Sequence, residues 1–146
     1  MEEQKYIIEE GSKPIPCEMY IRLSVFSDEK DFNPNELTQI LRIEPTATWH
    51  KDDLIRKNLY RKETCWCLKT TRVETFDFEE VFHMFMNVLT DKMYLLGNYA
   101  RENNLFVKIV PVIVVSNNMP WIVITKEIAD ALLLLNATIE FDMYFA

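Results

Sequence analysis

The sequence has little glycine, cysteine and histidine, and it has no long uninterrupted apolar run. Two glycines and six prolines among 146 residues, with 49% hydrophobic and 27% charged residues, exclude a collagen-like, low-complexity or disordered chain. Three cysteines are an odd number and too few for a disulfide framework, so we expect a reducing compartment. A membrane-spanning helix needs about 18 consecutive apolar residues, and Lys108 and Asp130 interrupt the two most apolar stretches. We therefore expect a protein that buries its own core and does not span a membrane.

Positive charge is also scarce. Lys and Arg number 16 against 23 Asp and Glu, which gives a formal net charge of -7. This balance argues against general binding to nucleic acid or to anionic membranes, because contacts to phosphate groups depend on Lys and Arg. The segment from Met1 to Lys5 lacks the cationic and apolar regions of a secretory signal. We therefore expect a cytoplasmic protein without nucleic-acid or membrane partners.

The sequence contains no recognised catalytic motif, phosphate-binding loop or cluster of metal ligands. Cys65-Trp66-Cys67 places two thiols on one face of a predicted strand, but no second cysteine pair completes a tetrahedral metal site. We interpret these thiols as small buried side chains. A catalytic pair between a cysteine and His50 or His83 stays open, because such partners need not be close in sequence. The favoured interpretation is a non-enzymatic protein with no cofactor and no metal.

The first half of the sequence predicts one strand and two helix starts. Residues 18–26 alternate between apolar and polar side chains, as in a strand with one buried face. Asn33 and Asp77 are predicted helix caps, and a glutamate, Glu36 or Glu80, follows each by three residues. Each glutamate is therefore expected to accept a hydrogen bond from the backbone amide of its cap.

The second of these helices is expected to be the longest element of the chain. Its apolar side chains are spaced to line one side from about Phe78 to near Asn103. Gly97 lies inside this stretch, and glycine costs about 1 kcal/mol relative to alanine in a helix interior. We therefore expect a kink or frayed turns at Gly97.

The second half of the sequence predicts strands around one further helix. Residues 105–115 are nearly all apolar, as in a central strand, and Pro111 predicts a bulge or an edge there. A short strand is expected at 121–124, then a helix that begins after Thr125 and ends at Asn136. The last ten residues alternate again. This order predicts a single α+β domain over 17–146, a largely antiparallel sheet with about three helices packed on it, preceded by an N-terminal arm, 1–16.

The stretch 42–64 has no clean period, and a loop of this length is a place to look for function. Residues 50–72 carry seven cations and three anions, a balance of +4 that leaves -11 on the remainder of the chain. Trp49 and Tyr60 would add stacking surfaces to an anion-binding lip. The alternative, which we favour, is a solvated basic loop. Glu140 and Asp142, two apart on the final strand, could act as an acid–base pair, but an exposed sheet face is the favoured interpretation.

A set of short motifs is spread along the chain. It consists of Asp31, Phe32, Pro34, Glu36, Leu37, Thr38, Leu41, Ile43, Pro45, Thr46, Trp49, Lys51, Trp66, Ile139, Phe141, Asp142 and Tyr144. Together these residues resemble the bacterial family catalogued as domain of unknown function 4279. The resemblance covers roughly residues 20–145 and implies a small, intracellular, single-domain protein, without implying an activity. A glycine expected after the lysine of the Trp49-x-Lys51 motif is absent.

Two functions are consistent with this sequence. The first is a protein-interaction module, such as an immunity-type protein that binds and blocks a basic toxin; its acidic charge suits a cationic partner. The alternative is a small-ligand-binding or enzymatic domain that acts on an anionic molecule through the basic loop 49–72. A homodimer built on a sheet edge or on the methionine-bearing helix is compatible with either. The candidate ligand-binding residues are Trp49, His50, Lys51, Arg56, Trp66, Asp142 and Tyr144.

Overall fold

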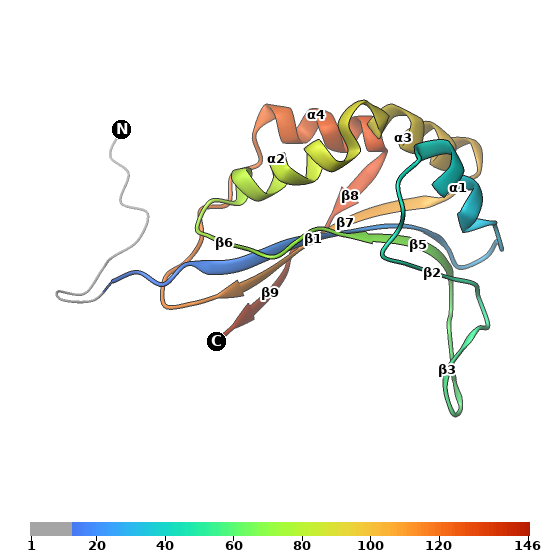
Figure 1. The fold of residues 1–146 in the computed structure, drawn as a ribbon, viewed down its shortest axis with the longest axis horizontal. Helices are drawn as coiled ribbons and strands as arrows, with labels where there is room; N and C mark the ends of the chain where they lie inside the picture. The colour runs from blue at the N-terminus through green and yellow to red at the C-terminus, as the bar shows by residue number, and fades with distance from the viewer. Residues whose placement is uncertain (1–12) are drawn as a thin grey trace.

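The computed structural model describes residues 13–146, so residues 1–12 of the expected arm lie outside the described part. The described chain forms one α+β domain, with helices packed on a mostly antiparallel sheet (Figure 1). The fold class expected from the sequence is confirmed. The helices are α1 (Pro34–Leu41), α2 (Phe78–Leu89), the single 3-10 turn η1 (Thr90–Lys92), α3 (Met93–Glu102) and α4 (Lys126–Leu135). The strands are β1 (Cys17–Ser27), β2 (Ala47–Trp49), β3 (Leu54–Arg56), β4 (Leu59–Tyr60), β5 (Thr64–Lys69), β6 (Val73–Thr75), β7 (Phe106–Val115), β8 (Ala137–Ile139) and β9 (Asp142–Phe145).

Strand β1 is the centre of the sheet. It pairs with β7 on one side and with β5 and β6 on the other, and all three pairs are antiparallel. β2 extends the sheet beyond β5, again antiparallel, whereas β8 and β9 lie parallel to β7. Among the described residues this gives a seven-stranded sheet with β2 at one edge and β8 and β9 at the other.

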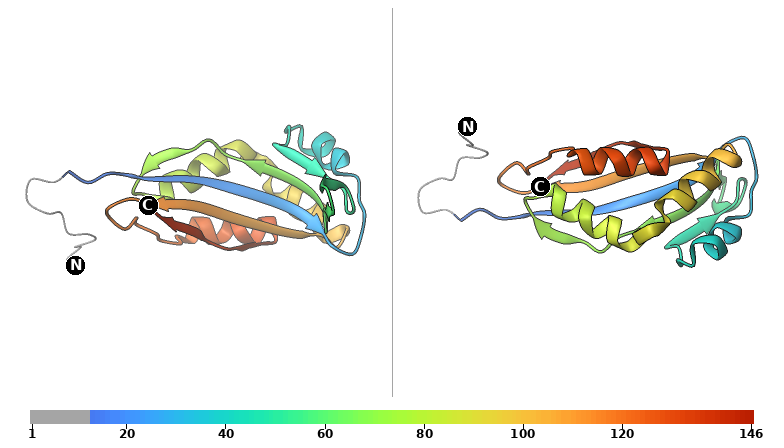
Figure 2. Two further views of the ribbon diagram at one scale, coloured as in Figure 1. Left: turned by 90° about the horizontal axis from the view of Figure 1, so that it is seen from below. Right: turned by 90° about the horizontal axis from the view of Figure 1, so that it is seen from above.

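The four α-helices of the described chain lie on the same face of the sheet (Figures 1 and 2). The alternation of residues 18–26 turns every second side chain of β1 toward the helices. These side chains and the phenylalanines of α2 are at most 1% exposed, and burial of each contributes about 1.5–3 kcal/mol. They are Met19, Ile21, Leu23, Val25, Phe78, Phe82 and Phe85.

The cap of α1 is where the sequence predicts it, but its glutamate has another partner. Asn33 Oδ1 accepts a hydrogen bond from the backbone amide of Asn35 at 3.1 Å. The expectation that Glu36 accepts from the Asn33 amide is wrong. Its Oε1 accepts instead from the hydroxyl of Tyr99 at 3.0 Å, which links α1 to α3. Tyr99 lies 63 residues away in sequence, so no local motif could reveal this partner.

The start of α2 repeats this result. Asp77 Oδ1 accepts from the backbone amide of Glu79 at 3.0 Å, as expected for a cap. Glu80 does not return a bond to the Asp77 amide. That amide donates to Thr75 Oγ1 at 3.0 Å, and the Thr75 hydroxyl donates to Glu80 at 2.8 Å. The threonine therefore stands between the two groups that the sequence predicts to pair directly.

The expected single helix from 78 to 103 is wrong, because the chain divides it at Thr90. This residue has φ 52° and ψ -119°, far from helical values, and separates α2 from η1 and α3. The expected irregularity at Gly97 is absent from α3, which continues through it. A Cβ at Gly97 would lie 2.0 Å from the backbone oxygen of Leu134 in α4. The glycine therefore permits close packing of two helices rather than a kink.

Pro111 lies in the middle of β7, in a central strand without the predicted bulge or edge. Its partner Ile21 directs both its backbone N–H and its C=O to Thr70, so Ile21 and Pro111 form a non-hydrogen-bonded pair. The nitrogen of Pro111 consequently faces the opposite side, where β8 ends at Ile139 and β9 begins at Asp142. The backbone N–H that proline lacks is therefore not needed, because no strand of residues 13–146 pairs with this side of β7 at the gap between β8 and β9. The final alternating segment is therefore two short strands rather than one.

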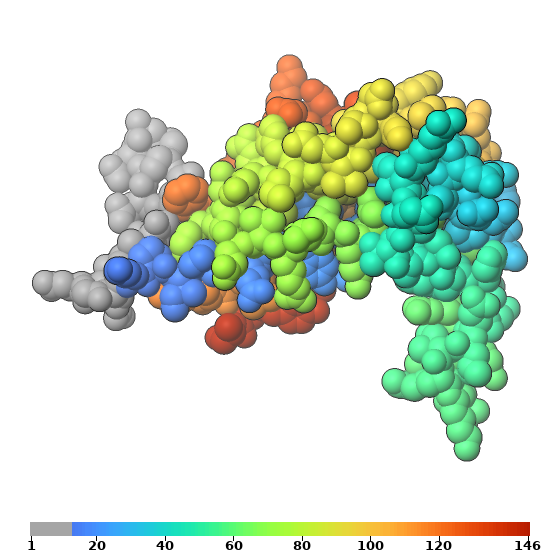
Figure 3. All heavy atoms as spheres, viewed as in Figure 1, coloured from blue at the N-terminus to red at the C-terminus, as the bar shows by residue number. Residues whose placement is uncertain are grey.

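Two other segments differ from expectation. The stretch 42–64, expected to be a loop, contains edge strand β2 and the separate hairpin β3–β4. The hairpin extends away from the body of the molecule (Figures 1 and 3). The expected strand at 121–124 is reduced to one parallel bridge between Trp121 and Asp77. The predicted helix after Thr125 is confirmed, with Thr125 Oγ1 accepting from the Ile128 amide and Asn136 ending it at φ 54°.

Candidate functional site

The face of the sheet opposite the helices brings together polar and aromatic residues that lie far apart in the sequence. We call it the open face, because no helix of residues 13–146 packs on it (Figure 1). Strand register places on one side the residues that alternate with the core. The open face comprises Tyr20, Arg22, Ser24 and Phe26 of β1, Trp49 of β2, Cys65, Cys67 and Lys69 of β5, Phe106, Lys108, Val110, Val112 and Val114 of β7, and Asp142 and Tyr144 of β9.

A pocket of about 260 Å³ lies on this face above the middle of β1. Lys108 Nζ forms an ion pair with Glu140 at 3.6 Å and lies 5.8 Å from the ring centre of Phe26. The guanidinium of Arg61 lies 4.0 Å from the ring centre of Trp49, a cation–π distance. The lining is therefore aromatic and carries both signs of charge. It consists of Arg22, Ser24, Phe26, Trp49, Glu63, Cys67, Lys108, Val110 and Glu140.

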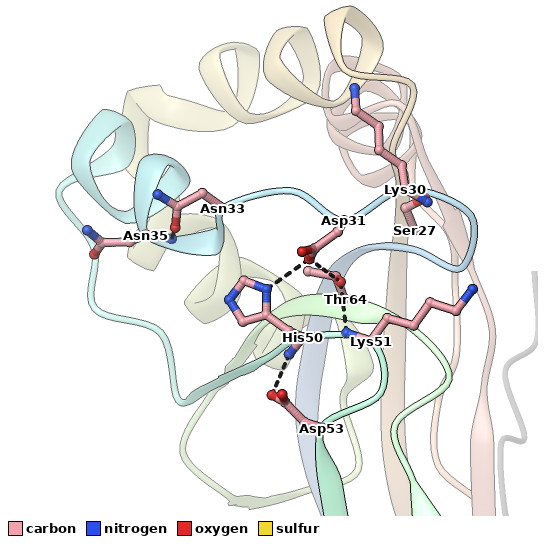
Figure 4. A network of polar contacts seen from close by, with 9 residues as sticks. All are labelled: Ser27, Lys30, Asp31, Asn33, Asn35, His50, Lys51, Asp53 and Thr64. Carbon is pink, nitrogen blue, oxygen red and sulfur yellow. Dashed lines mark hydrogen bonds and ion pairs between the residues drawn. The ribbon is translucent and has the colours of Figure 1, made fainter.

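A polar network next to the pocket fixes the base of the hairpin, and we call it the hairpin anchor (Figure 4). His50 Nδ1 lies 2.8 Å from Asp31 Oδ1, and the Thr64 hydroxyl donates to the same oxygen at 2.9 Å. The backbone amide of Lys51 donates to Thr64 Oγ1, and its Nζ donates to the carbonyl of Asp28. The bond from His50, followed by that from Thr64, lowers the pKa of Asp31 below 3.8. These contacts hold the hairpin to the segment between β1 and α1.

The structure separates the candidate residues predicted from the basic segment. Trp49 lines the pocket, whereas His50 and Lys51 belong to the hairpin anchor. Arg56 lies on the exposed hairpin, and among the described residues it does not line the pocket. The two aromatic residues expected in an anion-binding lip therefore lie on different elements, Trp49 on β2 and Tyr60 on β4, and Arg61 lies over the Trp49 ring.

Trp66 is the candidate that the structure places farthest from a surface. It is 0% exposed and, as predicted for a strand, points away from Cys65 and Cys67 toward the helices. Its Nε1 donates to Thr38 Oγ1 of α1 at 3.0 Å. Trp66 is therefore part of the core and lies apart from the pocket on the open face.

Asp142 and Tyr144 lie together on β9, at the edge of the open face. The Tyr144 hydroxyl donates to Asp142 Oδ2 at 3.0 Å, and this bond raises the pKa of Tyr144. Glu140 pairs with Lys108 rather than with Asp142. The two carboxylates considered as an acid–base pair therefore have different partners.

Cys65 and Cys67 are buried, and His83 lies next to two glutamates. The burial of the two thiols is as expected, and it raises the pKa of Cys65 to about 12. His83 lies 3.5 Å from Glu79 on its own helix and 3.7 Å from Glu127 of α4. Within residues 13–146, no group of three or more His, Cys, Asp or Glu side chains is arranged to hold a metal ion. No helix in this range is long and apolar enough to cross a membrane.

Sequence reasoning missed two cations that line the pocket, Arg22 and Lys108. Arg22 occupies the polar face of the predicted strand 18–26, and Lys108 is the single charge within 105–115. The sequence does contain an indication of these two cations, because a charged side chain within a predicted strand must point to an accessible face of the sheet. What the sequence lacked was the pairing of β1 with β7, which places residues 86 positions apart in one pocket.

One family of known proteins matches this chain. The sequence model described as domain of unknown function (DUF4279) matches residues 17–146, a range that begins at the first residue of β1. No curated protein and no solved structure gives a significant match. The resemblance noted from the motifs is thereby confirmed, and the chain belongs to the DUF4279 family.

Proposed function

We propose that this protein is a protein-interaction module and that it binds its partner through the open face. The observation that carries the proposal is a sheet face without a helix layer in the described chain, on which aromatic residues and charges of both signs gather. Protein interfaces favour this composition, since Tyr, Trp, Phe and Arg are enriched at their centres. Tyr20, Arg22, Phe26 and Trp49 supply these residue types on neighbouring strands.

The β3–β4 hairpin supports the same proposal. It projects beside the open face (Figures 1 and 3), and its Leu54 is 64% exposed and its Tyr60 53% exposed. Apolar side chains on a projecting hairpin gain little from the protein's own core, but they gain burial when a partner covers them. The hairpin anchor at Asp31, His50 and Thr64 would hold this element ready for contact.

The charge of the chain supports a basic partner, such as a toxin blocked by an immunity-type protein. The net charge is -7, and the chain outside residues 50–72 carries -11, so the attraction comes from the body of the protein and not from the +4 of that segment. An acidic body steers a cationic protein during encounter, and that steering weakens as salt screens it. For such a partner we expect the association rate to fall about tenfold or more as ionic strength rises from about 0.02 to 0.2 M.

A small-ligand function through residues 49–72 is less well supported. The hairpin extends away from the body of the molecule (Figure 1), and of residues 49–72 only Trp49, Glu63 and Cys67 line the pocket. None of these three is a cation, so the cations that an anionic ligand would meet in the pocket are Arg22 and Lys108.

The proposal is tested by capture of a partner from the native host with matched variants of the tagged protein. Tyr144 on the open face and Tyr94 on α3 are both tyrosines, 53% and 59% exposed. We expect Tyr144→Ala to reduce recovery of the partner, and Tyr94→Ala to leave it unchanged. Equal recovery with both variants, or loss only with Tyr94→Ala, would refute the proposal. Recovery of a second copy as the sole partner would favour the homodimer.

A further inference from the structure

The pocket on the open face contains a hydrogen-bond donor that the described protein does not satisfy. Trp49 lines the pocket, and its Nε1 is buried without a hydrogen-bond partner within residues 13–146. Buried indole N–H groups normally have an acceptor, as Trp66 Nε1 has in Thr38. The ring of Trp49 is held in place by Arg61 at 4.0 Å. Because Nε1 has almost no accessible surface, an oxygen of a bound group would reach it only if Arg61 or the Trp49 ring shifted.

The same pocket contains a cation that has no counter-ion within residues 13–146. Arg22 is half-buried on β1, between Lys69 of β5 and Val110 of β7. No carboxylate forms an ion pair with it in the described part of the chain, in contrast to Lys108, which pairs with Glu140 at 3.6 Å. A guanidinium presents two parallel N–H donors that match the two oxygens of a carboxylate. Arg22 is therefore suited to bind a carboxylate in the pocket.

An unpaired carboxylate lies at the other end. Glu63 lines the pocket and, within residues 13–146, forms no ion pair. It precedes Thr64, the partner of Ser27, whereas Arg22 is paired with Lys69. The two charges thus lie at opposite ends of a groove that follows β1, with Trp49 along its side. Phosphate or sulfate would meet repulsion from Glu63 and Glu140, whereas a ligand with a cation at one end would not.

We infer that this pocket binds a small extended zwitterion, of which a short peptide with free termini is the chemical type. Its carboxylate would pair with Arg22 and its ammonium group with Glu63, and its backbone would pack along the Trp49 ring that lines the pocket. The volume of about 260 Å³ equals roughly nine waters at about 30 Å³ each, which suits two or three small residues. This site goes beyond the proposed partner interface and does not rest on it.

The test is a titration of the full-length, ¹⁵N-labelled protein with di-alanine and tri-alanine. The three tryptophans give three indole N–H signals. The signal that disappears in the Trp49→Phe variant belongs to Trp49. We expect the Trp49 signal to shift with peptide concentration while the Trp66 signal, from a buried side chain bonded to Thr38, stays in place. Absence of any Trp49 shift up to about 10 mM of both peptides would overturn the inference.

Capped peptides and substitutions in the protein then test the carboxylate-binding end and the ammonium-binding end of the site separately. An N-acetylated peptide lacks the ammonium group and a C-terminal amide lacks the carboxylate, so each should bind about tenfold or more weakly. Arg22→Gln and Glu63→Gln should each weaken the uncapped peptide by a similar factor. Lys69→Gln is the matched control, because Lys69 lies opposite Arg22 but outside the pocket. Equal binding of capped and free peptides would refute the assignment even if a variant failed to fold.

These results are distinguishable from failure of the proposed function. Peptide binding is measured on the purified protein alone, whereas partner capture is measured in the native host. A protein that captures its partner through the open face but ignores both peptides would retain the proposed function and lose this site. The opposite pair of results would retain the site and lose the interface.

Discussion

Asp31 illustrates, at the scale of a single residue, what the sequence could and could not reveal. Its position before Phe32 and Pro34 belongs to the motif that identifies the family, so its presence was noted. Its partners His50 and Thr64 follow 19 and 33 residues later and depend on the pairing of β5 with β1. A local sequence pattern predicts the cap of a helix, but it does not predict contacts that depend on the pairing of distant strands.

The lowered pKa of Asp31 predicts a dependence of stability on pH. Because the folded-state pKa lies below the ordinary value of 3.8, the ionised carboxylate stabilises the fold above that value. This contribution is lost as pH falls below 3.8 and through the folded-state pKa. We expect Asp31→Asn to be less stable than the wild type at pH 5 to 6, with the difference disappearing toward pH 2 to 3.

Urea unfolding of both proteins across this pH range measures the effect. Asp28→Asn is the control, since Asp28 contacts Lys51 through its backbone carbonyl, which the substitution retains. A constant difference between wild type and Asp31→Asn down to pH 2 would contradict the assignment of the contact to the ionised carboxylate.

The helices show how far sequence reasoning extends at the scale of an element. Capping residues Asn33, Asp77 and Thr125 were predicted because a cap and its amides lie within three residues of one another. The division of the second helix at Thr90 is not predicted, since Thr90 and Asp91 disfavour helix only weakly and no proline or glycine marks a stop there. The role of Gly97 was also missed, because it depends on a backbone oxygen of α4.

Gly97→Ala tests the packing of α3 on α4. In an isolated helix this change would stabilise by about 1 kcal/mol, but here the new Cβ would meet the Leu134 oxygen at 2.0 Å. Backbone at this distance cannot rotate away, so the helices must separate. We expect the free energy of unfolding to fall by about 1–3 kcal/mol.

Chemical denaturation followed by circular dichroism gives this value directly. Asn98→Ala, one position along the same helix, is the matched control and should be neutral or slightly stabilising. A stabilising effect of Gly97→Ala would contradict the close contact between the two helices.

At the scale of the whole molecule, the alternation along 18–26 and the nearly continuous apolar run along 105–115 predict strands that share a core, and the α+β class follows from element order. The open face and its pocket did not follow, because they require the order of β2, β5, β1 and β7 in the sheet. The basic stretch and the Trp49-x-Lys51 motif point to Trp49, whereas Trp66 lies in the core. Only the pairing of β2 with β5 reveals that neighbouring tryptophans on these strands point to opposite faces.

Thiol reactivity reports the integrity of this fold as a whole. Cys17, Cys65 and Cys67 are each at most 2% exposed, and burial raises the pKa of Cys65 to about 12. Reaction with a thiolate-specific reagent therefore requires opening of the sheet. We expect all three thiols to react about 100-fold or more slowly in the native protein than in urea, relative to glutathione under the same conditions. Rapid labelling of one thiol in the native state would show that its strand is accessible.

The central claim is that the protein acts through the open face, and site-specific photo-cross-linking in the native host tests it most directly. A photoreactive phenylalanine replaces Tyr144 in one strain and Tyr94 in another, two exposed positions on opposite sides of the sheet. The account predicts a discrete cross-linked partner from position 144 and none from position 94. A partner cross-linked only from position 94 would contradict the account and assign function to the helix layer.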